Sequence, residues 1–366
     1  MPMELGKDLI VPIPKQICAL YFLQQRQECR GGGCSWNLTY EGIISLDNLL
    51  EAWKEFAQGK RSRKDMQQFE LRLMSNILSL HKDLIARTYK HSPYEAFNIS
   101  DPKPRNIHKA SVRDRLLHRA IYRILYPFFD RTFIATSFSC RRNKGGHKAI
   151  NHFRSLAQKV SRNNTRTIWV LKCDIRKFFA SIDHERLKKI LAQHIKDQDI
   201  LVLLAGIIDS FSMTQQEGIG LPLGNLTSQL LVNIYMNKFD QFVKHKLKVL
   251  HYIRYADDFV FLSTDKKWLE DILLRSSDFL WNDLWLTLHP DKISIRTLAS
   301  GVDFLGWVHF PDHRVLRTTT KRKMFRTILA NGGKDESVQS YLGLLSHGNG
   351  HKLREQIKNM GICTAA

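Results

Sequence analysis

Two neighbouring carboxylates, Asp257 and Asp258, stand between two short runs of strand-forming residues in the segment 252–262. Aromatic and β-branched residues favour strands, and Ala-Asp-Asp favours a tight turn, so the segment predicts a β-hairpin. Two adjacent acids at the tip of a buried hairpin repel each other and lose hydration, which a bound cation would offset. Oxygen ligands of this kind suit magnesium. An isolated Asp-Asp pair is more simply explained as two turn residues that cap a surface hairpin.

A third carboxylate, Asp174, ends another apolar run that begins at Trp169. This run also predicts a strand, and the chain turns into Phe178 and Phe179 shortly afterwards. Three acids on two strands can hold two metal ions about 4 Å apart, which stabilises the attacking and leaving oxygens of an in-line phosphoryl displacement. The three carboxylates together therefore predict nucleotidyl-transfer chemistry.

The chain resembles the reverse transcriptases in three blocks that occur in the family's order and spacing. They are the strand with Asp174, the segment Leu-Pro-Leu-Gly-Asn-Leu-Thr-Ser-Gln at 221–229 and the Tyr-Ala-Asp-Asp box at 255–258. The resemblance extends over about residues 101–344. It implies RNA-directed DNA synthesis, with two Mg²⁺ ions, or Mn²⁺, held by Asp174, Asp257 and the backbone carbonyl of Ile175, and with Asp258 supporting the site.

The implied fold is an α/β right-hand polymerase. Its parts would be an N-terminal extension of unknown role (1–44), helical fingers (45–165) with a basic hairpin (101–115), a palm with an antiparallel sheet and the catalytic site (166–310), and a short helical thumb (311–366). In the fingers, Ser45 predicts the cap of a first helix, and apolar spacing predicts a second helix over about 65–89. No room remains at the C-terminus for an RNase H or endonuclease domain.

The resemblance places six positions at the incoming nucleotide, namely Arg105, Arg113, Ile175, Phe179, Leu223 and Gly224. Arg105 and Arg113 stand where the family holds the triphosphate, and the fork of an arginine matches phosphate oxygens well. Phe179 stands where the family carries an aromatic ring that excludes the 2′-hydroxyl, although Phe178 and Phe179 also read as core residues. Gly224 lets the backbone approach the nascent base pair.

Two departures from the usual pattern suggest a subfamily. Most reverse transcriptases have Gln before this glycine and Pro after the serine, whereas Leu223 and Gln229 occupy those positions here. The reverse transcriptases of diversity-generating retroelements and of related defence systems share this departure, and the former also resemble the Ser-Phe-Ser-Cys-Arg stretch at 137–141. Loss of the polar Gln side chain beside the nucleotide predicts low fidelity.

Several basic or glycine-containing segments are expected to contact nucleic acid. The loop at 137–149 combines cations with backbone amides that suit template phosphates. The resemblance places the primer strand at the hairpin 304–307 and a proton-donating lysine at Lys292, and 313–326 carries six cations and no acid. The predicted contacts are Lys103, Arg141, Arg142, Lys144, Gln229, Gly306, Trp307, Lys321, Arg322 and Lys323.

The overall charge supports a polyanionic partner. Lys and Arg number 56 against 35 Asp and Glu, which gives a net charge of +21 and a pI near 9.8. Such a field attracts nucleic acid, and no amphipathic or lipidation signal favours a membrane. We expect a cytoplasmic protein with reduced thiols. Cys29 and Cys34 read as part of a flexible loop, or alternatively as half of a zinc site.

The expected substrates and partners are dNTPs, a specific structured RNA and the RNA–cDNA duplex. In one setting, a diversity-generating retroelement, the enzyme copies its template RNA with errors and works with a small accessory variability protein. In the other, a phage-defence system, it copies a dedicated noncoding RNA. An RNA-binding protein with a vestigial polymerase site is a third, different class.

Overall fold

The computed structural model describes residues 38–99, 104–212 and 217–362. Lys103 and the Cys29–Cys34 pair lie outside the described residues. Within those residues, no helix is both long and apolar enough to cross a membrane.

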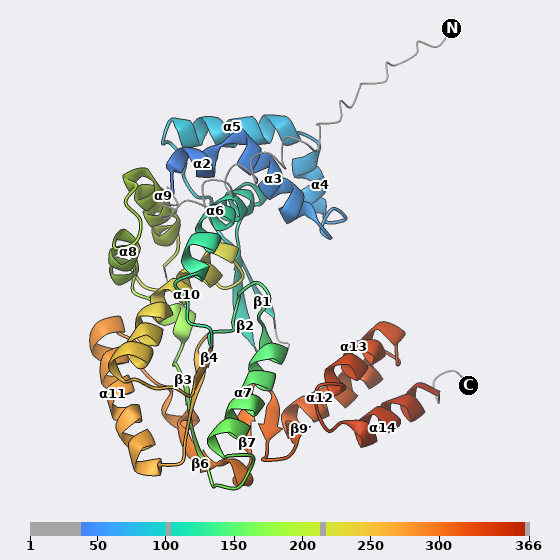
Figure 1. The fold of residues 1–366 in the computed structure, drawn as a ribbon. Helices are drawn as coiled ribbons and strands as arrows, with labels where there is room; N and C mark the ends of the chain where they lie inside the picture. The colour runs from blue at the N-terminus through green and yellow to red at the C-terminus, as the bar shows by residue number, and fades with distance from the viewer. Residues whose placement is uncertain (1–37, 100–103, 213–216, 363–366) are drawn as a thin grey trace, which may run out of the picture. The chain divides into compact units, whose positions relative to one another are not determined.

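Five helices form the first part of the described chain (Figure 1, blue to teal). They are α2 (Tyr40–Ile44), α3 (Leu46–Ala57), α4 (Lys64–Glu70), α5 (Leu73–Ile85) and α6 (Val112–Asp130). The expected cap is confirmed, because Ser45 Oγ accepts a hydrogen bond from the Asn48 amide at 3.3 Å. α2 packs on α3, α5 and α6, so residues 40–44 belong with these helices and not with the extension to which the sequence assigned them.

The single helix expected over 65–89 is wrong. The chain leaves the helical conformation at Arg72 (φ −124°, ψ 38°) between α4 and α5. The break lets the two helices bury different faces, with Met66 of α4 and Ile77 and Leu80 of α5 in the core. Asn76 Nδ2 donates to the Phe69 carbonyl at 3.0 Å and so satisfies a carbonyl at the end of α4.

β1 (Glu95–Ile99) and β2 (Arg105–Lys109) form a hairpin that leads into α6. The hairpin expected over 101–115 was placed too late in the chain, because β1 precedes that range and the residues from Val112 onwards belong to α6. The central sheet has the order β4-β5-β3-β6 and is antiparallel throughout. Its strands are β3 (Trp169–Asp174), β4 (Tyr252–Tyr255), β5 (Asp258–Ser263) and β6 (Ser294–Thr297). Six further elements flank or connect them: α7 (Gly146–Val160), α8 (His184–Ala192), α9 (Gln198–Asp209), α10 (Leu226–Gln241), α11 (Lys266–Leu284) and a 3₁₀ turn (Pro290–Lys292).

Alternating residues of the central sheet serve two separate cores. Val170 and Val260 belong to the cluster that includes Phe153 of α7. On neighbouring positions of the strands, Phe259 packs its ring 5.1 Å from that of Phe239 in α10. Both faces of the sheet are therefore covered, which explains why its strands read as continuous apolar runs.

A second sheet joins the C-terminal helices. Its order is β7-β8-β9, from β7 (Val302–Phe304), β8 (Trp307–His309) and β9 (Arg314–Leu316). α12 (Thr318–Ala330), α13 (Asp335–Leu345) and α14 (His351–Ile362) follow. Because β9 pairs with β8, the boundary expected at 310/311 falls inside this sheet, and the helical part begins only at α12. The mixed α/β architecture with antiparallel sheets agrees with the predicted fold class.

Candidate active site

The register of the central sheet brings the three candidate carboxylates together. Asp174, the last residue of β3, is the direct partner of Asp258, the first residue of β5. Asp257 lies in the β4–β5 turn, and its carbonyl accepts a hydrogen bond from the Ile175 amide at 3.1 Å. The ends of two adjacent strands thus position all three acids, as the hairpin pattern predicted.

The surroundings of the site disfavour the ionised forms of two of its acids, Asp257 and Asp258. Burial raises the pKa of Asp258 to about 7, and its Oδ1 is buried without a hydrogen-bond partner. Its Oδ2 lies 3.5 Å from Lys172 Nζ. Burial and the neighbouring Asp174 also raise the pKa of Asp257, while Lys292 and Arg105 act in the opposite direction. A cation bound beside these acids would favour their ionised forms and so offset the effect of burial.

Lys292 supplies one positive charge. Its Nζ donates to Asp174 Oδ1 at 2.6 Å from the 3₁₀ turn Pro290–Lys292. Two backbone contacts fix that turn, since the His289 amide donates to the Asp174 carbonyl at 2.8 Å and Leu288 forms a bridge with Ile175. The turn follows α11, which ends at Leu284.

The chemistry of the donor set fits a divalent cation. Within the described ranges, no three His, Cys, Asp or Glu side chains converge as a metal-binding group. The set expected from the sequence differs from such a group, because it combines two carboxylates, Asp174 and Asp257, with the carbonyl of Ile175. The buried, unpartnered Oδ1 of Asp258 marks a place where a cation would be favoured.

The two candidate triphosphate arginines lie in different surroundings. Arg105 is exposed on β2 and close enough to the site to lower the pKa of Asp257. Arg113 donates from Nη2 to Asp83 Oδ2 at 2.5 Å and stacks over Tyr89. Arg113 is thus engaged with α5, and a triphosphate would have to compete with Asp83 for it.

The two phenylalanines after Asp174 differ in how deeply they are buried. Phe178 is buried, at 4% exposure, whereas Phe179 is half-buried and meets Phe178 edge to face at 5.7 Å. The Phe179 carbonyl accepts from the Leu221 amide at 2.8 Å, which attaches the 221–229 segment to the site. Of the pair, Phe178 is therefore the core residue, and Phe179 is left as the candidate sugar contact.

Gly224 lies where the β1–β2 hairpin meets the 221–229 segment. It has a φ of +103°, and a Cβ there would lie 3.0 Å from Ile107 Cγ2. On either side, the His108 amide donates to the Leu223 carbonyl at 3.2 Å, and Asn225 Nδ2 donates to the His108 carbonyl at 2.9 Å. Gln229 is half-buried in the first turns of α10.

Two cations of the basic loop before α7 donate hydrogen bonds to other groups of the protein, which the sequence did not predict. Arg141 donates to Asp130 Oδ1 at 2.7 Å and to the carbonyls of Ile134 and Ser137. Lys144 donates to the Ala135 carbonyl at 2.7 Å. Arg142 stacks over Tyr126 but is exposed, so it is the residue of the three best placed to meet a phosphate.

At the C-terminal side, Trp307 also differs from its predicted role. It is 2% exposed within the core cluster, and a Cβ on Gly348 would clash with its ring. Gly306 forms the β7–β8 turn with a φ of +85°. On α12, Lys321 and Arg322 are exposed and Lys323 is half-buried. Trp307 therefore anchors the small sheet, and α12 presents the basic surface.

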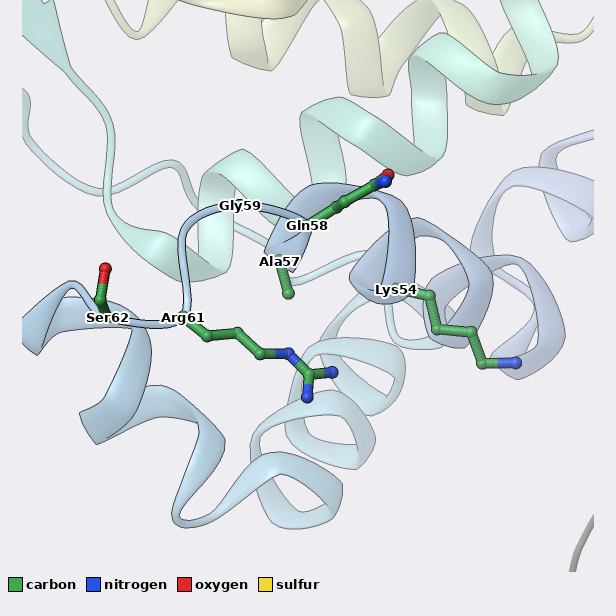
Figure 2. A pocket seen from close by; sticks show the side chains of 6 residues that line it. All are labelled: Lys54, Ala57, Gln58, Gly59, Arg61 and Ser62. Carbon is green, nitrogen blue, oxygen red and sulfur yellow. The ribbon is translucent and has the colours of Figure 1, made fainter. Parts of the chain in front are cut away.

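A surface pocket of about 540 Å³ lies away from these residues, where α3 gives way to α4. Figure 2 shows its lining, with Arg61 extended from the α3–α4 loop. Arg61 Nη2 lies 3.6 Å from Glu70, and Lys54 is paired with Glu51. None of the predicted site residues lines this pocket.

Comparison with known proteins identifies the family of the chain. Residues 98–309 match the family model described as reverse transcriptase (RNA-dependent DNA polymerase). Protein YkfC of Escherichia coli (strain K12) is 26% identical over 71% of this chain and 76% of its own length. Group II intron-encoded protein LtrA of Lactococcus lactis subsp. cremoris is 23% identical over 64% of this chain and 49% of its length.

Two further matches cover smaller shares. The putative COX1/OXI3 intron 2 protein of Saccharomyces cerevisiae is 22% identical over 64% of this chain and 34% of its own length. A structure of apo telomerase from Candida tropicalis has a TM-score of 0.45 and 14% identity, and the match covers 64% of this chain and 58% of that chain. The chain thus spans half or less of these intron-encoded relatives. Since the family model covers more than half of it, the chain belongs to the reverse transcriptase family.

Proposed function

We propose that the protein is an RNA-directed DNA polymerase that copies a specific structured RNA into cDNA. The observation that carries this proposal is the pairing of Asp174 with Asp258 across β3 and β5, beside the turn with Asp257. The family match supports the reaction class. The net charge of +21 exceeds what a nucleotide alone requires and supports a nucleic-acid partner.

In the proposed mechanism, Asp174, Asp257 and the Ile175 carbonyl would hold the metal ions. When bound, two Mg²⁺ ions supply activation of the primer hydroxyl and neutralisation of the triphosphate. Asp258 supports the site from β5, and Arg105 orients the triphosphate from β2. Lys292 Nζ, which is within hydrogen-bond reach of Asp174, provides a proton for the departing pyrophosphate.

The proposed assignment of parts follows the elements. The helices α2–α6 with the β1–β2 hairpin act as fingers, the central sheet with its flanking helices acts as the palm, and α12–α14 act as the thumb. Arg142, the β7–β8 turn and the cations of α12 provide contacts to the template and primer backbones, which position a duplex without reading its sequence.

Substrate selection is proposed to depend on Phe179 and Leu223. The Phe179 ring would lie beneath the sugar and leave no room for a 2′-hydroxyl. Leu223 is half-buried beside Gly224 and has no polar side-chain atom with which to test the geometry of the nascent base pair. Leu223→Gln is therefore expected to lower the misincorporation frequency in a defined-template assay. An unchanged error spectrum would contradict the proposed source of low fidelity.

Primer extension on an RNA template tests the reaction itself. The wild type should incorporate dNTPs in the presence of Mg²⁺, and Asp257→Ala should abolish extension while retaining the fold by circular dichroism. The competing hypothesis, an RNA-binding protein with a vestigial site, predicts RNA binding by both proteins and extension by neither.

Two biological settings are proposed, with the diversity-generating retroelement favoured by the 137–141 and 221–229 motifs. The alternative is a phage-defence reverse transcriptase. Relatives whose names describe intron-encoded proteins support a structured RNA as template in either case. Sequencing of the copurifying RNA and its cDNA separates the two settings. Substitutions concentrated at template adenines would support the retroelement, and faithful or repetitive phage-induced products would support defence.

A further inference from the structure

Arg254 and Asp240 form a buried pair next to the turn between β4 and β5. This turn carries Asp257 and is called the catalytic turn. Both side chains are 0% exposed. Arg254 Nε donates to Asp240 Oδ1 at 2.8 Å, and Arg254 Nη2 donates to Asp240 Oδ2 at 2.6 Å. This bidentate geometry fixes the orientation of the guanidinium as well as pairing its charge. Arg254 belongs to β4, and Asp240 belongs to α10.

The other donors of Arg254 reach the turn itself. Arg254 Nη1 donates to the Ala256 carbonyl at 3.2 Å. Ala256 has a φ of +56°, a left-handed conformation that costs a residue with a Cβ about 1 kcal/mol or more. Such a conformation persists only where its surroundings hold it. The next residue is Asp257, so the hydrogen bond from Arg254 acts one peptide unit away from a candidate metal ligand.

The same guanidinium also connects two more distant segments. Arg254 Nη2 donates to Ser137 Oγ at 3.1 Å, and Arg254 Nη1 donates to Asn233 Oδ1 of α10 at 3.4 Å. The Arg254 backbone completes the connection, because its amide donates to the Thr136 carbonyl and its carbonyl accepts from the Phe138 amide, each at 3.0 Å. The turn is thereby tied to the loop that precedes α7 and to α10.

Stability alone is a weak explanation for this arrangement. A buried ion pair is often no more stable than a well-packed apolar replacement, because burying two charges is expensive. Here Asp240 orients the guanidinium of Arg254 so that it also donates to the carbonyl of Ala256, the residue with a left-handed backbone that precedes Asp257. That additional hydrogen bond points to a role in the geometry of the site.

We propose that Arg254 is a positioning residue for the catalytic turn. Oriented by Asp240, it holds Ala256 in the left-handed conformation, so that Asp257 stays where it can share a divalent cation with Asp174. The inference deepens the proposed polymerase function and rests on it. A displacement of ~1 Å at a reacting group can cost about a hundredfold in rate, so loss of this hydrogen bond should be measurable.

The test compares Arg254→Lys and Asp240→Asn with a matched control, Tyr252→Phe. Tyr252 donates its hydroxyl hydrogen to Asp240 Oδ1 at 2.8 Å, so the control removes a buried hydrogen bond from the same cluster and leaves the Arg254–Ala256 contact in place. For each protein, the melting temperature, Mn²⁺ affinity by electron paramagnetic resonance and the Mg²⁺ dependence of primer extension are measured.

All three variants are expected to melt at a lower temperature. Only Arg254→Lys and Asp240→Asn should bind Mn²⁺ about tenfold more weakly and need correspondingly more Mg²⁺ for extension. Adding Ala256→Gly to Arg254→Lys should restore metal binding but not the melting temperature, because glycine adopts the left-handed conformation without support. Should Arg254→Lys fail to fold, Asp240→Asn decides the question alone, because it removes the carboxylate that orients the guanidinium.

Wild-type Mn²⁺ affinity in the folded Arg254 or Asp240 variants, or equal losses in Tyr252→Phe, would overturn the positioning role. Failure of the proposed function looks different. A wild-type protein that binds Mn²⁺ but extends no primer would contradict the polymerase, and Mn²⁺ binding by the variants would still decide the role of Arg254.

Discussion

Lys292 Nζ lies 2.6 Å from Asp174 Oδ1, so a lysine of the chain partly neutralises one of the three candidate catalytic acids. The ammonium reaches the carboxylate from a short turn whose backbone is bonded to the end of β3. Of the two lysines near the acids, Lys292 is the more exposed, at 42% against 18% for Lys172. Its exposure lets the side chain move from Asp174 to a substrate.

Lys292→Met is expected to lower the single-turnover rate of nucleotide incorporation by about 10²-fold, the lower end of the range for losing a general acid. The KM for dNTP should change less, because the proposed proton transfer is to the leaving group. Lys172→Met is the matched control, since Lys172 lies 3.5 Å from Asp258 but has no proposed role in proton transfer. Equal rate losses in both variants would show that only the local charge matters.

Asp258→Asn is expected to stabilise the protein in the absence of divalent cations, by about 1–3 kcal/mol. The reason is that burial disfavours the charged carboxylate and raises the pKa of Asp258 to about 7, whereas an amide of the same shape carries no charge. Chemical denaturation in EDTA measures the effect. Asp174→Asn provides the contrast, because Asp174 is already paired with Lys292 and should change stability by less than ~1 kcal/mol. A destabilised Asp258→Asn would contradict this account of the site.

Gly224→Ala is expected to destabilise the protein by about 1–3 kcal/mol and to raise the KM for dNTP, because φ +103° strains alanine and its Cβ would press on Ile107. Gly206→Ala in α9 is the control, since a Cβ there meets nothing within 4 Å and alanine favours a helix by ~1 kcal/mol. Melting curves and steady-state kinetics report both effects. Opposite signs of the two stability changes are the expected result.

His118 is expected to make the stability pH-dependent. Burial, followed by the nearby His91, lowers its pKa to about 3, from 6.5 in the unfolded chain. Only the unfolded state takes up this proton between those values, so the contribution to stability is present above pH 6.5 and is lost as the pH falls towards 3. At pH 5 the loss is about 2 kcal/mol.

Substitution of His118 isolates that contribution. Neither ring nitrogen of His118 has a hydrogen-bond partner, so His118→Phe keeps a planar aromatic ring, loses no hydrogen bond and removes the titration. The variant should gain stability over the wild type as the pH is lowered from 7 to 5, measured by denaturant unfolding at each pH. Parallel pH profiles for the two proteins would contradict the assignment.

The sequence predicted the strands and the turn that carry the three acids, because strand propensity and turn chemistry are local. The apolar runs around Asp174 and Asp257 indicated the strands, whereas the register that pairs Asp174 with Asp258 is seen only in the structure. The break at Arg72 was missed, because apolar residues continue at near-helical spacing through it. What decides the break is which face each half buries against α3, and that is a tertiary effect.

The roles of Arg141, Arg254 and Trp307 could not be predicted for a related reason. A basic or aromatic residue in a motif looks the same in sequence whether it faces a ligand or the interior. One signal was available, because Arg254 interrupts an apolar strand and Asp240 lies in an almost wholly buried helix. Charges in such places require a partner, and pairing them would have suggested the cluster behind the turn.

The strand order of the central sheet has a consequence for how the protein folds. β3 lies between β5 and β6, and both of these strands are synthesised long after it. Until then β3 is an apolar segment with two unsatisfied edges, and its pairings require the slow closure of large loops. We expect the helices before it to form early, while the nascent sheet depends on chaperones to avoid aggregation. An enzyme assembled this way gains its catalytic centre only after β5 and β6 have been synthesised.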